Sequence, residues 1–185
     1  SHHYFSDQNI MSADASCLIY SLTSPKKIFF SANSVTLEQD LLSDSIFIFR
    51  NNDNFSLPML NSEIDFDLAV FNQSSRVISF ENTNISQEGG ILLHKYGKKG
   101  FLFTSLNLFY FLDNQELCVE SVFPLSFKKY WLQPENNSFC FLKNGDMPIF
   151  TNATLIKKKR LLKDKLYNNV NVVVKPSLKL SIIND

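Results

Sequence analysis

The chain has 185 residues, of which 44% are hydrophobic and 19% are charged, and its 18 basic and 18 acidic side chains give a formal net charge of zero. This composition is typical of a globular chain and excludes an intrinsically disordered one. A neutral chain lacks the positive field of a general nucleic-acid binder, so nucleic acid is not expected as a partner. No apolar run reaches about 18 residues, so the sequence predicts no transmembrane segment.

The start of the chain is polar, and it predicts an N-terminal arm over residues 1–16, followed by a single β-rich domain over 17–185. A chain of this length can bury a core in one domain. The first two strands are expected at 17–22 and 27–30. The dipeptide Ser24-Pro25 between them is a turn signal.

A short helix is predicted next, over residues 36–42. Ser34 and Thr36 are both candidates for its N-cap, because a short side-chain oxygen there can accept a hydrogen bond from a free amide. Val35, Glu38 and Leu41 roughly follow helical spacing.

Five units of one pattern occupy the middle of the chain, each an aromatic-rich apolar run, a short polar break and a second apolar run. Asn, Asp, Gly and Ser bound these runs, which is the signature of strand, turn and strand. The paired runs are 46–49 with 55–60, 67–71 with 76–80, 91–93 with 100–103, 108–112 with 116–123, and 139–142 with 147–150.

The last third of the chain predicts a basic helix over residues 155–166, since its side chains are nearly all good helix formers. Leu155, Leu162 and Leu166 fall on one stripe of this helix, which we expect to be buried. Two strands follow, at 170–174 and around 178–182. We expect the terminal strand to pair inside its own sheet in preference to the sheet of another subunit.

These elements together predict a mainly β fold: an antiparallel sandwich or barrel of hairpins, with one short helix and a basic C-terminal helix. The 18 phenylalanines predict an aromatic core between the sheets.

Clustered cations and aromatic side chains provide the candidate binding residues. Two lysines stand beside an aromatic pair that includes the single tryptophan, and such groups can stack on sugar rings or form hot spots for a partner. The basic helix offers a second cationic cluster for an acidic partner or glycan, although a solvated outer face is the favoured interpretation of it. The candidates are Lys128, Lys129, Tyr130, Trp131, Lys157, Lys158, Lys159 and Arg160.

Alternating carboxylates provide the candidate metal ligands. Glu63, Asp65 and Asp67 fall on one face of a strand at period two, and close carboxylates can bind a hard cation or raise one another's pKa. His94 is the histidine available for acid-base chemistry away from the chain start. A structural or surface role is the favoured interpretation of His94, and an exposed strand face is the favoured interpretation of the carboxylates.

Three cysteines, Cys17, Cys118 and Cys140, leave two interpretations open. Cys118 and Cys140 lie in apolar runs, where a thiol acts as a small hydrophobe. In an exported protein the three could instead form one disulfide and leave one free thiol.

Short segments at 33–37, 45–49, 107–109 and 113–116, and Pro124 followed by Lys128-Lys129-Tyr130-Trp131, together form a recognisable pattern. Through these segments residues 33–142 resemble the SapC family, which is linked by name to bacterial surface-layer proteins. Gln115 or Glu116 stands where the family has a turn glycine, and Trp131 replaces its proline. The resemblance implies a surface-associated bacterial or phage protein with no established catalytic residues.

The sequence as a whole favours a non-enzymatic structural or interaction module, a surface, virion or assembly component that binds protein or glycan or forms a homo-oligomer. We expect no cofactor. Cell-surface, periplasmic or virion placement is favoured over the cytoplasm. The alternative is a small β-fold enzyme or a ligand or metal binder that uses Glu63, Asp65 and Asp67 with His94.

Overall fold

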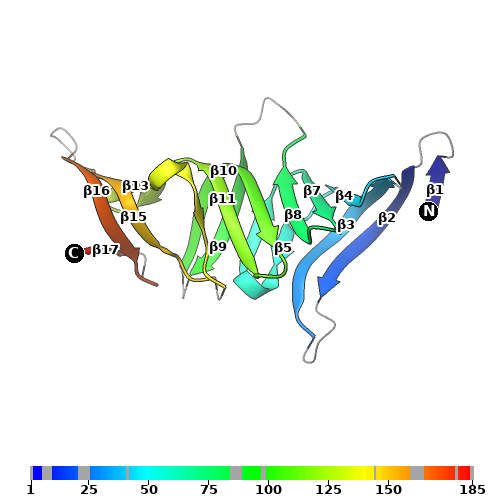
Figure 1. The fold of residues 1–185 in the computed structure, drawn as a ribbon, viewed down its shortest axis with the longest axis horizontal. Helices are drawn as coiled ribbons and strands as arrows, with labels where there is room; N and C mark the ends of the chain where they lie inside the picture. Colours follow the sequence, from blue (N-terminus) through cyan, green and yellow to red (C-terminus); the bar gives the residue numbers. More distant parts are fainter. Residues whose placement is uncertain are drawn as a thin grey trace.

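A computed structural model describes residues 2–5, 10–20, 26–40, 42–83, 89–96, 99–143, 145–158, 165–177 and 179–183. These residues form two sheets, of 12 and 5 strands, in which every described strand pair is antiparallel (Figure 1). The predicted mainly β fold is therefore confirmed.

The large sheet contains β1 (His2–Phe5), β2 (Ile10–Tyr20), β3 (Ile28–Asp40), β4 (Ser45–Arg50), β5 (Phe55–Leu57), β6 (Ser62–Asp65), β7 (Leu68–Asn72), β8 (Val77–Glu81), β9 (Gly90–Tyr96), β10 (Lys99–Phe111), β11 (Glu116–Val122) and β14 (Phe139–Cys140). The small sheet contains β12 (Leu125–Phe127), β13 (Tyr130–Gln133), β15 (Ile149–Lys157), β16 (Lys165–Val174) and β17 (Leu180–Ile183). Two 3-10 turns, η1 (Pro58–Leu60) and η2 (Glu135–Asn137), are the helical elements of the described chain.

Two long strands, β3 and β10, organise the large sheet. β2 occupies one edge of β3, so β4 and β5 must share the other edge; Val35 there pairs with Arg50 and Ser31 with Ser56. In the same way β11 occupies one edge of β10, while β8 and β9 share the opposite edge. The strands therefore form two half-sheets, β4–β7–β8 and β5–β6–β9, joined at both sides by β3 and β10.

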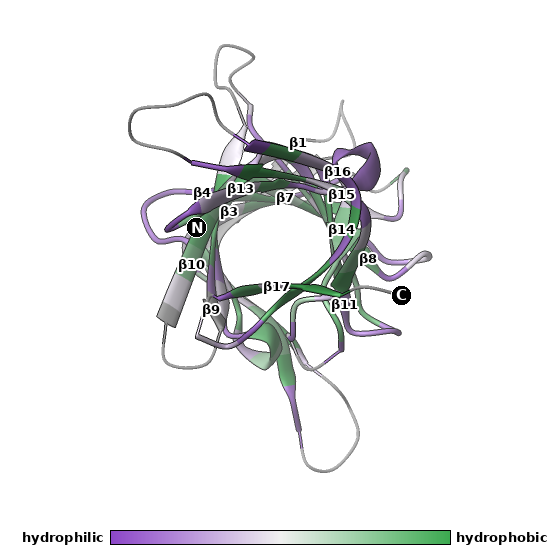
Figure 2. Cartoon of the chain, turned by 90° about the vertical axis from the view of Figure 1, so that its left-hand side faces the viewer, coloured by the Kyte–Doolittle hydropathy of each residue, from purple (hydrophilic) through white to green (hydrophobic). Residues whose placement is uncertain are grey.

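This arrangement combines the two predicted alternatives, because a sandwich whose corner strands belong to both layers is also a closed ring. The corner in β3 lies at a shift in its pairing with β2, where Ser34 takes a left-handed backbone with φ of 51°. Such irregularities bend a strand and increase its twist. Figure 2, viewed along the long axis, shows the strands arranged around a common centre.

A cluster of phenylalanines fills the space between the two half-sheets. Phe30 of β3 lies 5.6 Å from Phe55 of β5 and 6.2 Å from Phe80 of β8, measured between ring centres. All three rings are fully buried. Each such ring removes a large apolar area from water, so this cluster stabilises the contact between layers as the aromatic composition predicted.

The small sheet continues this core at one end of the molecule. Phe101 of β10 stacks on Phe127 of β12 with ring centres 5.0 Å apart, and Phe139 of β14 lies 5.2 Å from Phe150 of β15. The small sheet therefore packs on the part of β10 that pairs with β9. The β2–β3 hairpin extends the molecule at the opposite end (Figure 1).

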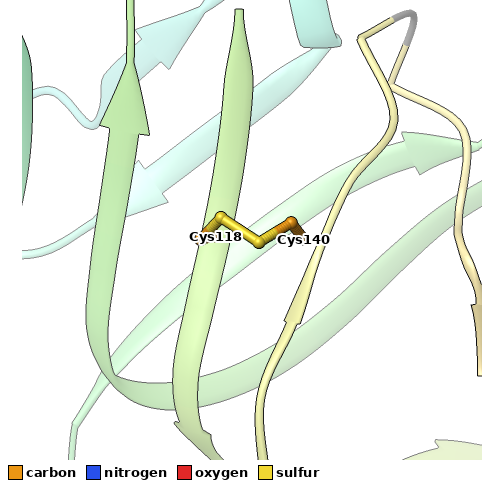
Figure 3. The surroundings of a disulfide bond; sticks show 2 residues. All are labelled: Cys118 and Cys140. Atoms are coloured by element: carbon orange, nitrogen blue, oxygen red, sulfur yellow. A yellow bond between two sulfur atoms is a disulfide. The ribbon is translucent and has the colours of Figure 1, made fainter. Parts of the chain in front are cut away.

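A disulfide links two neighbouring strands of the large sheet. Cys118 of β11 and Cys140 of β14 lie directly opposite one another, and their sulfur atoms are bonded (Figure 3). Cys17 is a free thiol whose pKa is raised by burial. The cysteine count left two interpretations open, and the structure agrees with the second, one disulfide and one free thiol.

Three of the five repeated units form the hairpins that the pattern indicates: β7–β8, β9–β10 and β10–β11. The first and last units do not. β4 pairs with β3 and β7, and β14 pairs with β11, so the partners of these strands come from elsewhere in the chain. Within the predicted N-terminal arm, residues 2–5 and 10–16 lie in the paired strands β1 and β2.

Both predicted helices are wrong. Residues 36–40 belong to β3, where Thr36 pairs with Phe49 of β4. In 155–166, the ends form β15 and β16, so that Lys157 pairs with Lys165; residues 159–164, with Leu162, lie outside the described chain. Pairing with neighbouring strands outweighed helix propensity in the described parts of both segments.

The predicted leucine stripe is also wrong, because Leu155 is 1% exposed and Leu166 is 55% exposed. The terminal strand prediction is confirmed, because β17 pairs with β16 inside the small sheet.

We predict that Leu155→Ala lowers the free energy of unfolding by about 2–4 kcal/mol, because it leaves a cavity in a closed core. Leu166→Ala should change it by less than about 1 kcal/mol, since that side chain lies mainly in solvent. Urea denaturation of both variants measures the difference. Equal losses would contradict the strand assignment of this segment.

A second prediction concerns Gly90, where an added Cβ would lie 2.3 Å from the ring of Phe66. Gly90→Ala should therefore overpack the core and cost about 1–3 kcal/mol in thermal or urea unfolding. Gly100→Ala is the matched control, because its Cβ would meet only the flexible Leu93 side chain at 3.3 Å. Its effect should stay within about 0.5 kcal/mol, and a similar loss at both glycines would refute the close packing at Gly90.

Candidate functional site

The two predicted cationic clusters lie next to each other in the small sheet. Lys128 and Lys129 form the turn between β12 and β13. β13 then pairs with β15, which places Tyr130 opposite Lys157 and leaves Lys158 just beyond the end of the strand. Strand pairing thus brings together residues about thirty positions apart in the sequence. Lys159 and Arg160, the other two candidates, lie outside the described residues.

Lys158 holds this hairpin in position. Its ammonium group donates to Ser126 Oγ at 2.9 Å and to the carbonyl oxygen of Phe127 at 3.1 Å. The same nitrogen lies 4.8 Å from the ring centre of Trp131, a distance at which a cation is attracted to an indole face. Lys158 therefore fixes both the turn and the tryptophan, which remains 40% exposed.

An open pocket of about 360 Å³ lies beside this turn. Phe127 of β12 and Leu180 of β17 both line it, although these strands are the two edges of the small sheet. The sheet must therefore curl strongly enough to bring its edges to one hollow. The lining residues are Phe127, Lys128, Lys129, Tyr130, Lys179 and Leu180.

The charge of this pocket comes from three exposed lysines, Lys128, Lys129 and Lys179. No described residue lining the pocket is acidic, so the lysines present an uncompensated positive surface there. Sequence reasoning missed Lys179 and Leu180. No sequence signal marks them, since only the curl of the sheet places β17 beside β12.

Apolar side chains continue from Trp131 across the same sheet. Trp131 pairs with Ile156, which in turn pairs with Leu166, so the three side chains form a cross-strand row. Trp131 and Leu166 are exposed and Ile156 is partly exposed. The lysine-rich end of the sheet thus adjoins an exposed apolar row.

The predicted carboxylate cluster has a different environment. The guanidinium of Arg50 forms a close ion pair with Asp65 and lies 3.5 Å from an oxygen of Asp67. Glu63 is farther along β6, opposite Leu93, and among the described residues the three carboxylates do not gather within 4.8 Å. Arg50 already supplies a positive charge to the two aspartates. Sequence reasoning missed it because only the pairing of β4 with β7 brings it there.

His94 is a core residue, 1% exposed. Its Nδ1 lies 2.8 Å from Ser62 Oγ, and its ring packs 4.5 Å from Phe141. Burial lowers the pKa of His94, an effect that the Gly145 backbone, the negative charge of Asp146 and the Leu60 backbone oppose. Since Ser62 is also buried, at 2% exposure, the pair has the setting of a structural contact.

No family model, curated protein or solved structure matches the chain. In the part of the chain that the structure describes, no helix has the length and hydrophobicity to span a bilayer.

The position of His94 predicts a pH dependence of stability. Burial lowers the pKa of this imidazole in the folded protein, whereas the unfolded chain takes up the proton near the ordinary pKa of 6.5, so the unfolded state binds more protons as the pH falls below that value. The contribution of His94 to the free energy of unfolding is therefore complete above about pH 6.5. Below that pH it decreases, by at most about 1.4 kcal/mol per pH unit.

Urea unfolding at pH 7.5 and pH 5.5 measures this loss. His94→Asn should be less stable overall but should lose less stability between the two pH values. An unchanged pH dependence in the variant would show that other groups cause it.

Proposed function

We propose that the protein is a non-enzymatic interaction module that binds an acidic glycan, one carrying carboxylate or sulfate groups, at the lysine-rich pocket of the small sheet. The observation that carries this proposal is the convergence of Lys128, Lys129 and Lys179 from opposite edges of one sheet on one pocket. An exposed surface of this kind attracts anions, because none of the described residues that line it carries a carboxylate to offset its charge.

The shape of the pocket supports a glycan over a flat protein surface. A hollow of about 360 Å³ accommodates one or two sugar rings, within the usual range for small-ligand sites. Tyr130 provides an aromatic wall beside the lysines. Sugar rings present apolar faces of C–H groups that pack on aromatic side chains, while their acidic substituents can pair with ammonium groups.

The environment of Trp131 offers a second contact surface, on the face of the sheet opposite Tyr130, because consecutive residues of a strand point to opposite faces. Lys158 holds the indole in place, so little side-chain entropy is lost when a partner packs on it. The neighbouring row of Ile156 and Leu166 is the kind of exposed apolar surface that partners cover. In this proposal the protein acts as a surface, virion or assembly component, and an acidic protein surface is the competing partner.

The proposal is tested by titrating the full chain with a sulfated heparin-derived oligosaccharide, a neutral oligosaccharide of equal length and a polyglutamate peptide. Calorimetry gives the affinity, and the fluorescence of the single tryptophan, Trp131, reports contact near the pocket. We expect binding of the sulfated oligosaccharide that weakens steeply with salt, and none of the neutral one.

The charge-reversal variant Lys128→Glu/Lys179→Glu should weaken this binding by at least about 10-fold, equivalent to about 1.4 kcal/mol. Lys26→Glu/Lys143→Glu is the matched control, with the same change of net charge at exposed lysines elsewhere. Equal losses in both variants would indicate a non-specific charge effect and overturn the pocket. Preferential binding of polyglutamate would show a protein partner in place of a glycan.

A further inference from the structure

Glu116, Cys118 and Cys140 form a compact cluster at the edge of the large sheet. Cys118 and Cys140 are direct cross-strand partners, with Cα atoms 4.0 Å apart (Figure 3). Glu116 stands two residues before Cys118 in β11, so both side chains point to the same face of the strand. A carboxylate oxygen and the two sulfur atoms all lie within 4.8 Å of one another.

Small molecules can reach this cluster. All three side chains are partly exposed. Cys140 lines an open pocket of about 290 Å³ on one side, together with Pro148, and it lines a second pocket of about 190 Å³ with Cys118. A reductant and a hydrated ion therefore both have a path to the sulfur atoms.

The chemistry of the cluster depends on its oxidation state. In the disulfide, the sulfur atoms carry no charge and are not thiolate ligands. A thiol or phosphine reductant supplies two electrons, the S–S bond breaks, and two protons complete the two thiols. Zn²⁺ can then displace both protons and bind the two thiolates.

The geometry after reduction suits zinc. Two cysteines and one carboxylate are accepted donors for this ion, and a water molecule can complete a tetrahedral site. Zinc–sulfur bonds of about 2.3 Å and zinc–oxygen bonds of about 2.1 Å place the ligand atoms about 3.5–4 Å apart. Because the three atoms already lie within 4.8 Å, side-chain rotation alone can reach this arrangement.

We propose that the reduced protein binds Zn²⁺ through Cys118, Cys140 and Glu116, so that one position in the fold is closed by a disulfide under oxidising conditions and by a metal ion under reducing ones. Either link connects β11 to β14 and preserves their register. This inference is independent of the glycan proposal, since its residues lie outside the lysine-rich pocket.

The test uses the full chain with Cys17→Ser, which removes the third thiol. Bound zinc is measured with a colorimetric chelator before and after reduction with a phosphine and its removal, and Co²⁺ replaces zinc to record the thiolate charge-transfer band. The oxidised chain should bind no zinc. The reduced chain should bind about one equivalent, and its cobalt complex should show the band of two thiolates.

Glu116→Gln should weaken zinc binding by at least about 10-fold. Glu120→Gln, two residues beyond Cys118 on the same strand face, is the matched control and should leave it unchanged, because Glu120 is outside the 4.8 Å cluster. Circular dichroism follows the fold throughout. The proposal would be overturned if the Glu116 and Glu120 variants bound zinc equally well, or if Cys118→Ser left zinc binding unchanged. Non-specific zinc binding by an unfolded reduced chain would give this result.

Discussion

The architecture depends on two strands, β3 and β10, that each serve two layers. Because a strand has only two hydrogen-bonding edges, a second partner on the same edge requires the strand to extend past the first and turn into the other layer. The buried rings of Phe30, Phe55 and Phe80 occupy the space that this turn encloses. Closure of the sheet and burial of the aromatic rings therefore depend on each other. The bends of β3 and β10 bring the two half-sheets together, and the size of the buried rings sets the distance between them.

The sequence predicts this fold as far as local pattern determines it. Alternating aromatic and β-branched runs identified the strands and three of the hairpins, since each of these depends on neighbours in sequence. The helix over 155–166 failed because good helix formers also occupy an exposed strand face, and a partner strand decided between the two. Nothing local distinguishes Leu155, which is buried, from Leu166, which is exposed.

The candidate site shows the same limit. Lys128, Lys129 and Trp131 were visible as a cationic aromatic motif, and Lys157 and Lys158 as a basic run, but their contact arises from the pairing of β13 with β15. Lys179 and Arg50 had no local signal, because Lys179 reaches its neighbours through the curl of the small sheet and Arg50 through the pairing of β4 with β7. Lysines of one cluster have different roles. The ammonium group of Lys158 donates hydrogen bonds within the fold, whereas Lys128 and Lys129 are exposed to solvent.

The disulfide also has a mechanical consequence. β1 and β17 lie toward opposite ends of the long axis, so tension between the ends of the described chain would run along the molecule (Figure 1). At Cys118 the load would cross the covalent bridge to Cys140 and bypass the intervening segment, which contains β12 and β13. The turn that carries Lys128 and Lys129 would therefore bear no load directly along its backbone. A protein held under shear could in this way keep its lysine-bearing turn in shape while other strands are stretched.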